Sequence, residues 1–323
     1  MKLKKEYFLL GAVIIGLCLY LALKETDRTH YQMPKLSEVS KNEISKLRIK
    51  TEGSTIDMKK KGEAWVVGPK EYPADADKVK EMLDAVASLK LTALVSESKN
   101  YIRYDLNQAE KIAVKALSGD TVLREFEIGK AAPTYQHTFV KLAGNPNVYH
   151  ARGYFRTKFD NTLDEFRDHT VLKFGKEKIR KVEIVSGKDT SVMAAKEVSE
   201  KKTDEKAEKK SPDAPLKKMV WEAVSGKPVD RAKLNRMVSD LSDLACESYM
   251  EDAVKADFKD PVFRVTLKGE KDYTLSVFAK TKADAEDYPA ISSESPYVFL
   301  LSNSRVDSFK KTVEEEKKPE KTQ

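Results

Sequence analysis

Cysteine is nearly absent from this chain of 323 residues, which contains only two. Cys18 lies in an apolar run near the N-terminus, and Cys246 lies far from it in a helix-like segment. Neither residue has a partner at the spacing typical of metal ligands or redox pairs. The sequence therefore excludes a disulfide framework and a cysteine-based metal centre, and it predicts no cofactor.

Catalytic motifs are missing as well. The chain has four histidines, and none of them belongs to an HExxH pattern. It has no carboxylate-rich calcium loop either. The thirteen glycines lie mostly at turns and form neither a phosphate-binding loop nor a G-x-S-x-G elbow. These absences favour a protein that is not an enzyme.

Positive charge is not concentrated in any segment large enough to bind nucleic acid. The chain has 59 lysines and arginines against 52 aspartates and glutamates, for a net charge of +7. The two signs are mixed along the sequence, and no nucleic-acid-binding module accompanies them. We therefore expect no nucleic-acid partner.

One long hydrophobic run is present, over residues 7–23. About 17 residues is the short end of what spans a hydrocarbon core of about 30 Å. No small-x-small cleavage site follows the run, which argues against a cleaved signal peptide. Leu17 precedes Cys18 where a lipoprotein would need a small residue. The sequence thus predicts an uncleaved signal anchor.

The orientation of this anchor follows from the lysines in residues 1–6, which favour the cytoplasmic side. The prediction is a single-pass protein of the bacterial inner membrane. Its N-terminus would lie inside, its span would contact the lipid bilayer, and the bulk of the chain would be periplasmic.

The chain also contains an internal duplication. Segments starting at Trp65 and Trp221 each place a strand before a proline turn and an amphipathic helix. The tryptophans could line a carbohydrate-binding surface, but their equivalent positions favour a role in the core. Asp75 or Asp77 in the first copy, and Asp230 in the second, stand where a helix N-cap is expected. At an offset of 155 residues, Val79, Met82, Leu83, Val86 and Leu89 match Leu234, Met237, Val238, Leu241 and Leu244.

Further matches lie downstream at an offset near 150 residues. They pair Leu117 with Leu267, Gly119 with Gly269, Val148 with Val298, and Phe159 with Phe309. Alternating apolar and polar residues between these positions predict half-buried antiparallel strands. The predicted fold class is therefore α+β, an N-terminal transmembrane helix followed by two tandem repeats of an antiparallel sheet with a packed amphipathic helix.

These patterns divide the chain into successive parts. They are a cytoplasmic flank over 1–6, the span over 7–23, a linker over 24–43, a first repeat over 44–174, a second repeat over 175–309, and a tail over 310–323. The second repeat holds an insertion over 196–215 that is rich in lysine and glutamate. Its composition, like that of the tail, predicts disorder.

Four residues are the candidates for contact with a ligand or a partner. His137 and His150 flank a predicted hairpin and could approach one another. Arg167 and Asp168 belong to the charged segment 160–174, which is predicted to be a short helix bridging the repeats through charge-assisted hydrogen bonds. No residue is predicted to be catalytic, to bind a cofactor or to ligate a metal.

Several motifs together carry a family resemblance. They are the W-x-x-x-P…P-A-D helix entry from Trp65, a strand ending in E-I-G-K, a V-Y-H-A strand and the F-R-D-H-T-V-L-K-F segment. With the N-terminal anchor, they resemble the bacterial membrane-anchored family called domain of unknown function 4340. The resemblance covers residues 44–309 and is most specific over 65–173. It implies no catalytic residues.

The resemblance also implies a setting, because members of that family often occur beside ABC-type transport components. We therefore expect a non-enzymatic interaction module accessory to an ABC-type transport or envelope complex, with transporter subunits as candidate partners. The alternative is an envelope domain that binds glycan, peptide or lipid between the repeats. An envelope hydrolase would instead require titratable residues gathered in a deep cleft. The oligomeric state does not follow from the sequence.

Overall fold

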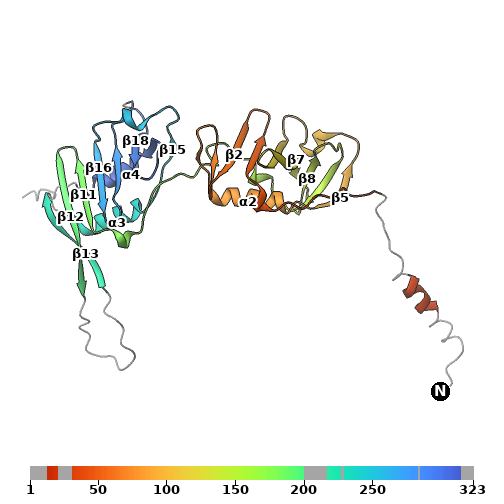
Figure 1. Cartoon of the computed structure of the whole chain (residues 1–323), viewed down its shortest axis with the longest axis horizontal. Coiled ribbons are helices and arrows are strands. Elements are labelled where there is room, and N and C mark those ends of the chain that lie inside the picture. The colour runs from red at the N-terminus through yellow and green to blue at the C-terminus, as the bar shows by residue number, and fades with distance from the viewer. Residues whose placement is uncertain (1–12, 21–30, 200–216, 227–228, 283, 314–323) are drawn as a thin grey trace, which may run out of the picture. The chain divides into compact units, whose positions relative to one another are not determined.

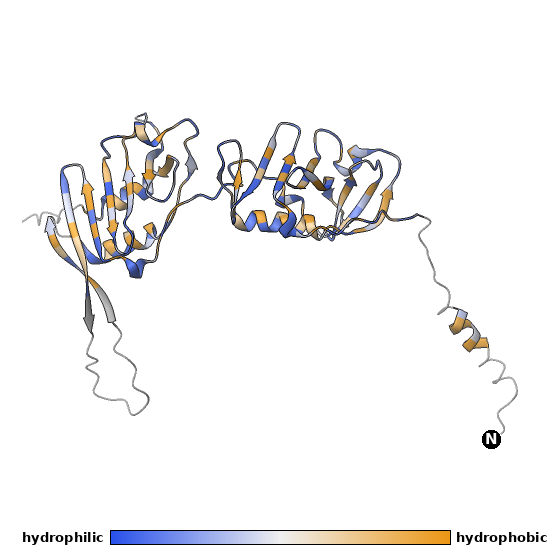
Figure 2. Cartoon of the chain, viewed as in Figure 1, coloured by the Kyte–Doolittle hydropathy of each residue, from blue (hydrophilic) through white to orange (hydrophobic). Residues whose placement is uncertain are grey.

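The computed structural model describes residues 13–20, 31–199, 217–226, 229–282 and 284–313. The chain divides into two compact units, Met1–Arg167 and Asp168–Gln323 (Figure 1). The division lies ahead of the boundary at residue 174 that the sequence suggested. In each unit, polar and apolar residues alternate along the strands (Figure 2).

The predicted fold class is wrong in its first element, the transmembrane helix. Of the predicted span, only residues 13–20 are described, and they are helical. In the part of the chain that the structure describes, no helix is long and apolar enough to cross a membrane. The same finding contradicts the predicted localisation as a single-pass protein of the inner membrane. Residues 1–12 and 21–30 lie outside the described residues.

The described residues of the first unit form one sheet of nine strands. The strands are β1 (Lys46–Lys50), β2 (Thr55–Lys61), β3 (Ala64–Val67), β4 (Tyr72–Pro73), β5 (Leu91–Ser96), β6 (Ile112–Ser118), β7 (Thr121–Ala131), β8 (His137–Leu142) and β9 (Val148–Arg152). Their order across the sheet is β4-β3-β2-β1-β6-β7-β8-β9-β5. All neighbours pair antiparallel.

Helix α2 (Ala76–Ala87) lies along one face of this sheet (Figure 1). It begins after Asp75, whose carboxylate accepts hydrogen bonds from two backbone N–H groups of the first turn. This confirms the predicted N-cap and decides between the two aspartates. The helix buries Val79, Met82 and Val86. Burial of each such side chain contributes about 1.5–3 kcal/mol to folding.

The second unit contains an eight-stranded sheet within the described residues. Its strands are β11 (Lys181–Ser186), β12 (Asp189–Ser199), β13 (Lys217–Gly226), β15 (Ser248–Tyr249), β16 (Phe263–Lys268), β17 (Tyr273–Val277), β18 (Asp287–Ser292) and β19 (Phe299–Ser302). Their order is β13-β12-β11-β16-β17-β18-β19-β15. From β3 onward the first sheet has the same order, strand for strand. Two further strands, β10 (Thr170–Lys173) and β14 (Asp243–Ala245), pair with each other.

Helix α3 (Arg231–Leu241) is the second unit's counterpart of α2. The carboxylate of Asp230 accepts a hydrogen bond from the backbone N–H of Lys233 at 2.8 Å, which confirms this N-cap too. The helix buries Leu234, Met237, Val238 and Leu241. Helix α4 (Asn303–Lys310) follows the last strand. Short 3-10 helices occupy Lys41–Glu43, Tyr101–Tyr104, Arg156–Lys158, Lys176–Lys178 and Lys255–Asp257.

The predicted equivalence of Leu117 and Leu267 is wrong by one residue. Leu117 pairs with Lys46 on the outer side of the first sheet and is only half-buried. Leu267 is fully buried, and so is Ala116, the residue before Leu117. Because side chains alternate between faces along a strand, a one-residue shift moves a position to the opposite face. Ala116 is therefore the true counterpart of Leu267.

Three further expectations need correction or fall outside the described residues. Strand β12 continues to Ser199, so the predicted insertion over 196–215 begins within a strand, and residues 200–216 are not described. At the tail, Thr312 is still buried, and residues 314–323 are not described. The predicted bridging helix over 160–174 is wrong, since the chain makes a turn over 163–166 and then enters β10. Thr162 and Glu165 stabilise that turn, because the side chain of each accepts a hydrogen bond from the backbone N–H of the other.

Candidate functional site

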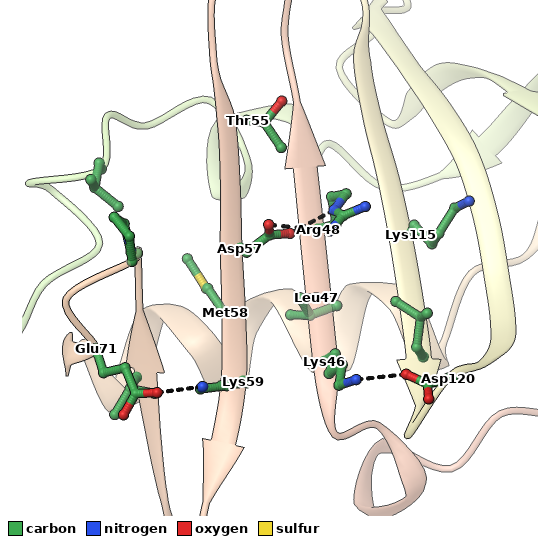
Figure 3. Close-up of a pocket in the computed structure, with 15 residues that line it drawn as sticks. Lys46, Leu47, Arg48, Thr55, Asp57, Met58, Lys59, Glu71, Lys115 and Asp120 are labelled. Carbon is green, nitrogen blue, oxygen red and sulfur yellow. Dashed lines mark hydrogen bonds and ion pairs between the residues drawn. The ribbon is translucent and has the colours of Figure 1, made fainter.

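The outer face of the first sheet, on the side away from α2, is hollowed into a groove of about 540 Å³. Figure 3 shows its charged side chains in front of the strands, with the helix behind. The alternation of the strands explains the arrangement: Leu47 and Met58 are buried, whereas their neighbours Arg48 and Asp57 are exposed. We call this hollow the outer-face groove. Its charged lining consists of Lys46, Arg48, Asp57, Lys59, Glu71, Lys115 and Asp120.

Ion pairs hold these charged groups in a fixed pattern. Arg48 pairs with Asp57 across β1 and β2, with Nε–Oδ1 at 2.6 Å and Nη2–Oδ2 at 3.2 Å. Lys46 Nζ lies 2.8 Å from Asp120 Oδ1 (Figure 3). The Arg48–Asp57 pair is bidentate, and its two parallel contacts fix the geometry of the pair as well as adding attraction. The ion pairs thus hold positive and negative groups at set positions in the groove.

Glu71 closes one end of the groove and is held by two lysines. It pairs with Lys59 and with Lys61, the latter at 2.9 Å. Hydrogen bonds from these lysines lower the pKa of Glu71 from 4.5 to about 2. A general acid or base works best with a pKa near the operating pH. Glu71 therefore stays ionised at neutral pH and acts as a fixed charge.

The wall of the outer-face groove includes a close contact between Gly68 and Leu163. Gly68 has a φ of +75°, which favours glycine, and a Cβ there would lie 3.2 Å from Leu163 Cδ1. The turn after β3 can therefore pack closely against the segment that contains Leu163. This contact makes one side of the groove apolar.

A second groove, of about 970 Å³, lies elsewhere on the first unit. We call it the tyrosine groove, because Tyr104, Tyr135 and Tyr154 line it together with His150. Tyr135 and Tyr154 are exposed and meet edge to face, with ring centroids 5.9 Å apart. Tyr135 also has a φ of 57°, a backbone conformation that is unusual for a bulky side chain. Such conformations concentrate at functional sites.

The floor of the tyrosine groove is a small core on the sheet face. Segment 101–106 covers this part of the sheet and packs Tyr104 and Leu106 against Phe139 and Val148. Gly129 of β7 permits the close approach, because a Cβ there would collide with the backbone carbonyl of Tyr104.

The structure brings together the two histidines singled out from the sequence. The rings of His137 and His150 stack with centroids 5.3 Å apart, and Phe139 lies 4.9 Å from His150. Burial lowers the pKa of His150, and the neighbouring His137 lowers it further. Only His150 lines the tyrosine groove.

Arg167 and Asp168 have local structural contacts and line neither groove. Arg167 is buried, with its guanidinium 4.1 Å from the centre of the Tyr72 ring and its Nη1 3.0 Å from Asp164 Oδ1. The backbone carbonyl of Asp168 accepts a hydrogen bond from the Tyr249 hydroxyl at 2.6 Å. These contacts position the chain where it leaves the first unit and where it enters the second.

Sequence reasoning missed the charged residues of the outer-face groove. A signal was present, because Lys46 and Arg48 on one strand and Asp57 and Lys59 on the next alternate with apolar residues. Their pairing across the strands depends on register, which the alternation alone does not supply. Within the described ranges, no group of three or more His, Cys, Asp or Glu residues is placed to hold a metal ion.

The fold and the grooves define a class of protein, a tandem antiparallel-sheet protein whose first unit carries open grooves on its surface. The family model named Domain of unknown function (DUF4340) matches residues 65–227, just over half of the chain. The chain belongs to this family, which confirms the resemblance seen in its motifs. No curated protein and no solved structure matches the chain.

Proposed function

We propose that this protein is a non-enzymatic interaction module that binds another protein through the outer-face groove. The observation that supports the proposal is the fixed arrangement of charges held by Arg48–Asp57, Lys46–Asp120 and the Glu71 pairs. Arranged charges of this kind select a partner by electrostatic complementarity. The depressed pKa of Glu71 suits a fixed charge better than a proton-transfer group.

ABC-type transport components are the first partners to test. Family members often occur beside such components, so an accessory role in a transport complex is the specific form of the proposal. A second candidate function is the binding of a glycan, peptide or lipid. The tyrosine groove favours it and lies within the first unit, whereas the sequence suggested a site between the repeats.

A charge swap separates recognition from stability. The double variant Arg48→Glu/Asp57→Lys keeps an ion pair but exchanges the positions of its positive and negative charges in the groove. Both side chains are more than half exposed, so the swap should change the free energy of unfolding by less than about 0.5 kcal/mol. We expect its affinity for co-expressed ABC-type transport subunits, measured by biolayer interferometry, to fall by about tenfold or more.

The matched control is the same swap at an exposed pair in the second unit, Lys178→Glu/Glu270→Lys. This control should bind as the wild type does. The proposal fails if the wild-type chain does not bind the transport subunits. It also fails if the groove swap and the control swap have equal effects.

A further inference from the structure

Strand β5 forms one edge of the first sheet, and this edge is unprotected. Its six residues, Leu91–Ser96, include no charged residue and no proline. Proteins usually protect an edge by shortening it or by placing charge or proline on it. The opposite edge of the same sheet follows this rule, because β4 has two residues and contains Pro73. The counterpart of β5 in the second unit, β15, also has only two residues.

Backbone hydrogen-bonding groups along β5 are available on one side. The strand pairs with β9 and, among the described residues, with no other strand; it stands at the end of the sheet in Figure 1. Its side chains are half-buried or exposed, as expected of an edge. An extended polypeptide can add to such an edge as a further strand, with main-chain hydrogen bonds providing affinity.

The tyrosine groove adjoins this edge. Val95 of β5 and His150 of β9 line the groove on the sheet side, and Tyr135 and Tyr154 line it on the loop side. Alternate side chains of an added strand point to one face, so they would enter the groove. Exposed tyrosines are frequent anchors of protein interfaces.

The charge of the groove selects the kind of segment. Arg103, Lys130 and Arg156 line it, against one carboxylate, Asp105, which lies 3.3 Å from Lys130. Arg156 is held by Asp160 at 3.3 Å. In the described part of the chain, no hydrogen bond or ion pair engages the guanidinium of the exposed Arg103. The groove therefore offers one cation that is not neutralised, and it complements a negatively charged segment.

We infer that β5 and the tyrosine groove together bind an extended, acidic segment of a partner protein by strand addition. The inference rests on the proposed function only in that the chain acts by binding another protein. It concerns a different surface, and its test uses neither the outer-face groove nor a transport component.

The test uses the full chain and fluorescein-labelled ten-residue peptides that alternate glutamate with valine. Two matched peptides replace glutamate by lysine, or carry N-methyl groups on alternate amides so that they cannot pair with a strand. Fluorescence anisotropy should show that each matched peptide binds at least about tenfold more weakly than the acidic peptide. Arg103→Glu should weaken binding of the acidic peptide similarly, whereas Arg236→Glu, an exposed residue of α3, should not. Amide exchange over residues 91–96 should slow when the acidic peptide is bound.

Several outcomes would overturn the inference. They are equal binding of the acidic and lysine peptides, no effect of N-methylation, no binding of any peptide, or binding without slower exchange over residues 91–96. Slower amide exchange around the groove with a soluble oligosaccharide, and not with the peptide, would also overturn the inference and would favour glycan binding. Failure of this test leaves the charge-swap test of the outer-face groove unaffected, so the two proposals can fail separately.

Discussion

The replacement Arg124→Met should destabilise the first unit, because this buried arginine joins two parts of it. Arg124 extends from β7 and donates hydrogen bonds to the carbonyls of Val86 and Ala87 at the C-terminal end of α2, the latter at 3.2 Å. It also donates to the carbonyl of Ser37. A cation at this position favours the helix terminus electrostatically. Methionine keeps most of the length of the side chain but supplies no donor.

The expected loss follows from these contacts. A hydrogen bond from a charged group contributes about 1.5–3 kcal/mol, and a cation at a helix C-terminus contributes about 0.3–1 kcal/mol. Val86 is fully buried and its carbonyl would stay unpaired, whereas the exposed Ser37 can bind water instead. Burial lowers the pKa of Arg124, so the substitution also removes a cost of burying charge. We therefore expect a net loss of about 3 kcal/mol in the free energy of unfolding.

Urea unfolding followed by tryptophan fluorescence measures this loss. The chain has one tryptophan in each unit, Trp65 and Trp221. In a Trp221→Phe background, the signal from Trp65 reports on the first unit alone. Limited proteolysis near Ser37 should accelerate in the Arg124→Met variant, because the segment loses its link to α2.

The control is Arg103→Met, an exposed arginine that should change stability by less than about 0.5 kcal/mol. Arg124→Lys should lie between the wild type and the methionine variant, since lysine keeps the charge but not the fork of donors. A loss below about 1 kcal/mol for Arg124→Met, or a loss equal to that of the control, would refute the reasoning.

Three other predictions concern single positions. Gly129→Ala should cost about 1–3 kcal/mol in thermal unfolding because its Cβ would displace the covering segment, while Gly53→Ala has open space and should cost less than about 0.5 kcal/mol. The pKa of His150 is lowered from 6.5 in the folded state. Folding stability should therefore be complete above pH 6.5 and decline as the pH falls below it, since the unfolded chain binds the proton more readily; His150→Gln should flatten this part of the urea-unfolding profile. Asp75→Ala and Asp230→Ala should each cost about 1 kcal/mol by urea unfolding, and a loss near zero would contradict the capping geometry.

The hydrophobic run near the N-terminus shows where a local pattern was insufficient. Its composition and flanking lysines predicted a membrane span over 7–23, but no helix among the described residues is long and apolar enough to cross a membrane. Hydropathy measures the preference of residues for an apolar environment. It does not by itself establish a helix long enough to span that environment.

The sequence by itself determined the N-cap of α3, the buried faces of α2 and α3, and the family, because each depends on residues close together in the chain. It narrowed the N-cap of α2 to two aspartates, and the structure decided between them. Only the tertiary structure decided which strand ends the sheet, that Arg48 meets Asp57, and that the tyrosine groove adjoins β5. It also decided that Ala116, the neighbour of Leu117, faces the core. The physical reason is that strand order and register arise from contacts between distant segments, and a shift of one residue reverses every face.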